Sequence, residues 1–66
     1  MNNNKLKGIL VEKGKTYSDC SKVLGLTITG FSNKINGHSN FYIHEANKLS
    51  EYLQLTEDEK VAIFLP

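Results

Sequence analysis

The side chains best suited to catalysis or metal binding in this chain are one cysteine and two histidines, and all three are isolated. Cys20, His38 and His44 form no paired arrangement such as CxxC or HxxxH, so the sequence offers no metal-ligand framework. It also lacks a glycine-rich phosphate loop and a cysteine–histidine pair close in sequence. We therefore expect no catalytic residue, no metal, no cofactor and no small-molecule ligand, and a protein that is not an enzyme.

Short polar side chains suited to hydrogen bonding gather instead in the stretch GLTITGFSNKING, which covers residues 25–37. Its threonines, serine and asparagines are middling or poor helix formers, and Gly30 costs roughly 1 kcal/mol against alanine in a helix interior. A strand would depend on residues 27–29 alone, because glycine and a polar run follow at once. We favour a helix over residues 28–36, since Thr27 is a good N-cap and Phe31 and Ile35 share one face.

Two helices are expected before this stretch. The first has Asn3 or Asn4 as its cap, an apolar face with i, i+3, i+4 spacing and a stop at Gly14. Thr16 opens the second, which Gly25 closes after about eight residues. The apolar positions of these two helices are Leu6, Ile9, Leu10, Cys20, Val23 and Leu24.

Two more helices are expected after it. The fourth runs roughly over residues 42–53, with Asn40 as a candidate cap and apolar residues at Ile43, Ala46, Leu49 and Leu53. The fifth covers residues 57–64 and follows a capping box formed by Thr56 and Glu59. The sequence therefore predicts an all-α fold of five short helices in a single domain spanning residues 1–66.

Size and charge limit the possible functions. The chain has 66 residues and one cysteine, so no internal disulfide can form, and it holds no apolar run of the ~20 residues needed to span a membrane. No signal peptide is evident, and we expect a cytoplasmic protein with no membrane contact. Net charge is +1, with +4 over residues 1–48 and −3 over residues 49–66, which suggests a basic face and an acidic end.

Two short helices joined by a tight glycine-containing turn are the plan of a helix-turn-helix, here over about residues 16–36. The cap, turn and core residues follow one another in a set order in the segment KGKTYSDCSKVLGLTITGFSNKINGHSNFYIHEANKLSEYLQLTEDE. In that order the chain resembles the small phage repressor and Cro-type proteins of the lambda-repressor-like fold. It departs from them at Tyr17, where most relatives have glutamine, and at Cys20 and Ser21, where they often have an aliphatic residue and alanine.

The resemblance implies that the third helix enters the DNA major groove. It implies base contacts by Ile28, Thr29, Ser32 and Asn33, with Ile28 on a thymine methyl and Asn33 on adenine. It further implies phosphate contacts from the second helix, the third helix and the loop after it. These residues are Thr16, Tyr17, Ser18, Thr27, Lys34, Asn36, His38 and Ser39.

Relatives of this kind bind inverted half-sites as homodimers, so we expect double-stranded DNA with an inverted repeat as partner. The run KVAIFLP has more apolar residues than one helix face can bury, which predicts a dimer surface within residues 57–66. Its expected members are Val61, Ile63, Phe64 and Leu65, with Ile63 the most exposed. The alternative is a monomer in solution that pairs only on DNA.

The function implied is a sequence-specific transcriptional regulator of phage origin that represses by occupying operator DNA in a bacterial host cell. Low net charge and the uncharged third helix keep a second interpretation open. In that interpretation, the same fold binds another regulator, as an antirepressor or antitoxin-like partner would.

Overall fold

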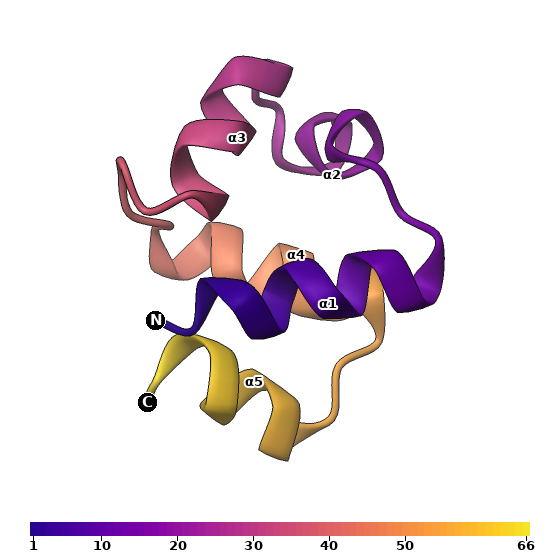
Figure 1. The fold of residues 1–66 in the computed structure, drawn as a ribbon, viewed down its shortest axis with the longest axis vertical. Helices are drawn as coiled ribbons and strands as arrows, with labels where there is room; N and C mark the ends of the chain where they lie inside the picture. Colours follow the sequence, from indigo (N-terminus) through magenta and orange to yellow (C-terminus); the bar gives the residue numbers. More distant parts are fainter.

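The computed structural model describes all 66 residues and contains five helices and no strand (Figure 1). The helices are α1 (Asn3–Lys13), α2 (Tyr17–Leu24), α3 (Ile28–Ile35), α4 (Ile43–Leu53) and α5 (Glu57–Phe64). The radius of gyration is 10.5 Å and the longest dimension is 28 Å. The prediction of a compact, all-α chain of five short helices is therefore confirmed.

Threonine caps fix where three of the helices begin, as the sequence predicts. The hydroxyls of Thr16, Thr27 and Thr56 each accept a hydrogen bond from the backbone N–H three residues later, at 2.9–3.1 Å. Before α1 the cap is Asn2, whose side-chain oxygen accepts from the Lys5 N–H at 3.1 Å, so neither Asn3 nor Asn4 has that role. A side-chain oxygen at each start satisfies one of the helix's free donors.

The start of α4 differs from the prediction, because Asn40 is not its cap. Tyr42 is the N-cap residue, and its backbone N–H donates to Oε1 of Glu45 at 2.9 Å. The end of α3 also differs by one residue, since Asn36 lies outside the helix as its C-cap. Gly14 and Gly25 end α1 and α2 in the left-handed conformation, at φ of 67° and 68°, which glycine adopts without strain.

The core forms where α1 packs against α3 and α5, and α2 packs against α3 and α4. Figure 1 shows α2 and α3 together at one end of the molecule and α5 at the other. The nine buried apolar residues are Leu6, Ile9, Leu10, Cys20, Phe31, Ile35, Leu49, Leu53 and Ile63. Edge-to-face contacts between rings, with centroids 5.4–6.1 Å apart, link Tyr17, Phe31, Phe41 and Phe64 across this core.

Two apolar residues lie opposite to where the sequence places them. Ile63, predicted to be the most exposed residue of the dimer surface, is completely buried, so that prediction is wrong. Its carbonyl accepts a hydrogen bond from the Asn2 N–H at 2.7 Å, because α5 packs on α1 near the chain ends. Ile43, predicted to continue the apolar face of its helix, is 83% exposed, since it is the first residue of α4 and extends beyond the core.

None of the helices has the length and apolar character that crossing a lipid bilayer requires. The structure also brings together no group of three or more histidine, cysteine, aspartate or glutamate side chains that could hold a metal ion. Burial raises the pKa of the Cys20 thiol to about 11, which keeps it protonated as a small core side chain.

Candidate nucleic-acid interface

One face of α3 is buried and the other is open to solvent. Phe31 and Ile35 are completely buried, whereas Ile28 is 53% exposed and Thr29 and Asn33 are also exposed. An isoleucine left half-open at the start of a helix that has just two buried residues is available for an apolar contact. The open face therefore presents the short polar side chains of Thr29 and Asn33, and Ile28 is exposed at the start of the helix; none of the three is charged.

The start of α3 adds free donors to this face. Thr27 accepts from the Gly30 N–H at 2.9 Å. The two N–H groups before it, at the first positions of α3, have no partner within the helix, as at any helix start. The first turn holds no acidic residue, so the partial positive charge of the helix start is not neutralised locally. This end of α3 can therefore attract an anionic group.

The start of α2 is similar in geometry but carries a carboxylate. Thr16 and Asp19 form the predicted reciprocal pair, in which the Thr16 N–H donates to Asp19 at 3.0 Å and the Asp19 N–H donates to Thr16 at 3.1 Å. The backbone hydrogen bond from Thr16 is the main reason that the pKa of Asp19 lies below its ordinary value. A phosphate at this helix start would meet the free N–H groups of Tyr17 and Ser18 together with that negative charge.

Tyr17 lies half-buried, and its ring packs edge-on against Phe31 with centroids 5.4 Å apart. The ring therefore fixes α2 against α3. Thr16 and Thr27 are exposed at their helix starts, and Ser18 is half-buried beside the first of them. His38 and Ser39 are exposed in the loop that follows α3.

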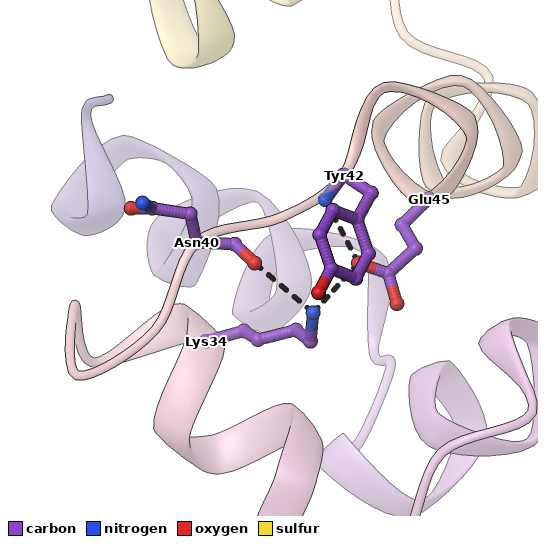
Figure 2. Close-up of polar contacts among 4 residues, drawn as sticks. All are labelled: Lys34, Asn40, Tyr42 and Glu45. Carbon is purple, nitrogen blue, oxygen red and sulfur yellow. Dashed lines mark hydrogen bonds and ion pairs between the residues drawn. The ribbon is translucent and has the colours of Figure 1, made fainter.

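Lys34 was expected to contact phosphate, and the structure places its ammonium in internal contacts instead (Figure 2). Nζ lies 2.8 Å from Oε1 of Glu45 and 3.0 Å from the carbonyl oxygen of Asn40, and it sits 4.4 Å from the centre of the Tyr42 ring. The Lys34 side chain is 11% exposed and that of Glu45 is 5% exposed. The Lys34 ammonium is therefore not free to contact a phosphate as expected, because its donors are used to join α3 to α4.

The Lys34–Glu45 pair also defines the charge state of Glu45. Burial alone would raise the pKa of this carboxyl, but hydrogen bonds from Lys34 and from the Tyr42 backbone N–H outweigh burial, so the pKa lies below its ordinary value. The carboxylate is thus ionised at neutral pH and holds the beginning of α4 and the end of α3 together. The Lys34–Glu45 pair is the one salt bridge in the structure.

Ser32 and Asn36 lie beside the open face of α3 and bind each other. The side-chain amide of Asn36 donates to the Ser32 carbonyl at 2.9 Å and to the Ser32 hydroxyl at 3.2 Å. The side-chain oxygen of Asn36 accepts from Nζ of Lys7 in α1 at 2.6 Å. Ser32 is half-buried, so its hydroxyl is less available to a ligand than the side chains of Thr29 and Asn33.

The residues of the expected dimer surface separate into exposed and buried members. Val61 is 46% exposed and Leu65 71% exposed, Phe64 is half-buried, and Ile63 lies in the core. Phe64 and Leu65 line a mostly apolar hollow of about 490 Å³ between the start of α4 and the end of α5. The other residues that line this hollow are Met1, Asn40, Phe41, Ile43, Ala46, Asn47 and Lys60.

Sequence reasoning missed the pairing of Lys34 with Glu45 and that of Lys7 with Asn36. The residues of the first pair are 11 positions apart and those of the second 29 positions apart, so neither belongs to a local motif. The only available signal for the first was Glu45 itself, which stands three residues after the N-cap, where a carboxylate can accept from the cap N–H.

No family model matches this chain, and no curated protein or solved structure is significantly similar to it.

Proposed function

We propose that α2 and α3 form a helix-turn-helix and that the protein is a sequence-specific DNA-binding regulator of transcription, a repressor of the phage Cro type. In this arrangement α2 lies across the DNA backbone while the open face of α3 enters the major groove. The three-residue connection through Leu26 and the packing of α2 on α3 support the proposal, because they make a rigid pair of helices with one exposed face.

The observation that carries the proposal is the contrast between the two faces of α3. Thr29 and Asn33 are exposed on the face opposite Phe31 and Ile35, and Ile28 is exposed at the start of the helix. A half-exposed isoleucine suits a thymine methyl group, and an asparagine amide can donate to and accept from adenine at once. The proposed recognition face therefore favours A·T-rich sequence.

Phosphate groups would bind at the starts of α2 and α3, where backbone N–H groups are free. The remaining candidates for phosphate contacts are Thr16, Tyr17, Ser18, Thr27, Asn36, His38 and Ser39. These contacts would position α3 without selecting sequence, and they make affinity depend on salt.

Strong specificity usually needs two copies of so small a module, so we propose a homodimer on an inverted-repeat operator. Val61, Phe64 and Leu65 stay in its proposed surface, and we add Ile43 and Met1, which are exposed and line the hollow together with Phe64 and Leu65. Repression then follows from occupancy of the operator, which excludes polymerase or a competing regulator.

The test is selection from randomised duplex DNA, followed by titration of the enriched sequence at 50 and 200 mM salt. The proposal expects one short, roughly symmetric, A·T-rich sequence to be enriched, with affinity that falls as salt rises. Absence of both enrichment and salt dependence would overturn it.

A second candidate function is a protein-interaction module, favoured by the exposed apolar side chains around the hollow between α4 and α5. Ile43 and Leu65 are 83% and 71% exposed and line the same hollow, so they form a clustered apolar surface rather than isolated exposed residues. A protein with this function would bind another regulator through that hollow. Substituting Asn33→Ala on α3, outside this hollow, separates the two functions, since a partner-binding module would keep its partner while a DNA-binding regulator would lose affinity for its selected sequence.

A further inference from the structure

A chain of hydrogen bonds leads from α1 to the open face of α3. Nζ of Lys7 donates to Oδ1 of Asn36 at 2.6 Å, and the amide nitrogen of Asn36 donates to Ser32 at 2.9 Å. Since Asn36 uses its oxygen for one neighbour and its nitrogen for the other, its side chain is fixed in both directions. The bonds hold the Lys7 ammonium at the end of α3, next to the proposed recognition face.

The Lys7 ammonium has no carboxylate partner in this position. Its hydrogen-bond partner is a neutral amide, and no carboxylate lies within salt-bridge distance of it. An ammonium group has three donors, of which one is used here. Lys7 is half-buried, so its stem is held by the protein while donors are left for a ligand.

Lys7 also lines a polar hollow of about 490 Å³ at the start of α1, where the two chain ends meet. None of the lining side chains is acidic, and the polar ones besides Lys7 are the amides of Asn2, Asn3, Asn4 and Asn36. Met1, Ile35 and Pro66 complete the lining. Oδ1 of Asn3 is buried without a hydrogen-bond partner in the protein; as an acceptor it would not bind a phosphate oxygen directly.

The other lysines of α1 face a different part of the molecule. Lys5 and Lys13 lie close enough to Glu59 in α5 to lower the pKa of that carboxyl, after the larger effect of its hydrogen bond from the Thr56 backbone. Their charges are therefore partly balanced by an acidic helix start, whereas the charge of Lys7 is not. This difference makes Lys13 a matched control on the same helix.

We propose that Lys7, with Asn4 and Asn36 beside it, binds a phosphate group, and that this group belongs to the DNA backbone at the end of α3. The site rests on the proposed DNA-binding function and extends the interface to α1. The free N–H groups in the first turn of α1, which has no acidic residue, add to the attraction for the same anion. Lys7 thereby replaces Lys34 as the proposed cationic contact to phosphate near the end of α3.

The experiment compares Lys7→Met with Lys13→Met, using the selected duplex and a random duplex between 50 and 200 mM salt. Losing one phosphate contact lowers the slope of log K against log salt by about 0.9, so the wild type should lose about 3.5-fold more affinity than Lys7→Met over this range. The change should be equal for both duplexes, because a phosphate contact carries no sequence information. Lys7→Arg should restore the slope, and circular dichroism confirms that each variant is folded.

The outcomes separate this inference from the function on which it rests. If the wild type binds DNA and Lys7→Met behaves like Lys13→Met, the phosphate site is wrong while the DNA-binding function stands. If the wild type binds no DNA, the proposed function fails, and titration with inorganic phosphate monitored by NMR decides the site. Shifts confined to the amides of Asn3, Asn4 and Asn36 would then support a site for free phosphate, and unchanged spectra would overturn it.

Discussion

Two helices of equal length, α3 and α5, show how one capping arrangement can serve opposite purposes. Each has eight residues and begins after a threonine that accepts from the third N–H of the helix. The first turn of α5 holds Glu57, Asp58 and Glu59, which neutralise the helix start, whereas the first turn of α3 holds no acid. The cap fixes where a helix begins, and the charges beside it decide whether an anion can approach.

The two helices also differ in how they are held. At its end α3 is joined to α4 through Lys34 and Glu45 and to α1 through Asn36 and Lys7, and it buries two side chains. The short helix α5 buries just Ile63 and has no side-chain bond to another helix. We therefore expect α3 to be rigid and α5 to be the helix that opens more readily.

The largest expected effect comes from removing the ring that holds α3 in the core. Phe31→Ala should destabilise the fold by about 3–5 kcal/mol, because Phe31 is completely buried between two other rings. That is a large share of the roughly 3–10 kcal/mol expected for a domain of this size. In α5, Phe64→Ala should cost only about 1–2 kcal/mol, since Phe64 is half-buried.

Urea denaturation followed by circular dichroism measures both effects. If Phe31→Ala is too unstable to study, Phe31→Leu should still cost about 1 kcal/mol or more. Equal losses at the two positions would contradict the view that α3 is the better-held helix.

The next effect concerns the pair that joins α3 to α4. Glu45→Gln should lower stability at pH 7 by about 2–3 kcal/mol, because it leaves the Lys34 ammonium without its carboxylate in a largely buried place. Since the pKa of Glu45 is lowered in the folded protein, its contribution is complete above about pH 4.5 and is lost as pH falls below that value. The variant should therefore lose less stability on acidification than the wild type does.

Urea midpoints at pH 7 and pH 3 test this statement, with Lys34→Met completing a double-mutant cycle. A wild-type acid dependence that Glu45→Gln leaves unchanged would assign that dependence to Asp19 and Glu59, the other two carboxyls whose pKa is lowered.

A third prediction compares the effect on DNA binding of a substitution on α3 with that of a control substitution on α5. Asn33→Ala should weaken binding to the selected DNA sequence by about 1–3 kcal/mol while leaving non-specific binding unchanged, because Asn33 is expected to read a base. Stability should change by less than about 0.5 kcal/mol, since the side chain is exposed. The α5 control Asp58→Asn should leave the sequence preference as it was, and an equal effect of the two substitutions would remove Asn33 from the recognition face.

The smallest effect should come from the two threonine caps. Thr27→Ala and Thr56→Ala should each cost about 1 kcal/mol of stability, because each removes one acceptor for a helix N–H. Only Thr27→Ala should also weaken DNA binding, since Thr27 lies at the helix start proposed to meet phosphate. Thermal melting and DNA titration of both variants measure this, and equal DNA affinities would argue against a phosphate at the start of α3.

The helices were predictable because their signals are local. Threonine caps and glycine stops act within a few residues, and the spacing of Phe31 and Ile35 identifies a buried face without knowledge of its neighbours. Prediction was harder where the chain has no local signal. The end of α4 at Leu53 was predicted although Gln54, not glycine, follows it in the left-handed conformation, whereas Ile63 was misplaced because the apolar run from Val61 to Leu65 contains no polar residue to mark its outer face.

The candidate site was predictable in part for the same reason. Exposure of Asn33 follows from the helical period once Phe31 is placed in the core, whereas Ile28 has the period of the core face and is exposed because it is the first residue of α3. The position of each lysine did not follow, because Lys34 and Lys7 are oriented by partners distant in sequence. A positive charge in the sequence predicts a cation at the surface, and only the tertiary arrangement decides which anion it can meet.

The hydrogen bond between the Asn2 N–H and the Ile63 carbonyl has a kinetic consequence. It joins residues near opposite ends of the chain, in a protein whose other helix contacts mostly connect segments closer in sequence. Closing so long a loop has a larger entropic cost than forming a helix or its cap, so this contact should form after the rest of the core. Protection of the Asn2 amide from hydrogen exchange would then report when folding is complete, and its loss would be an early sign of unfolding.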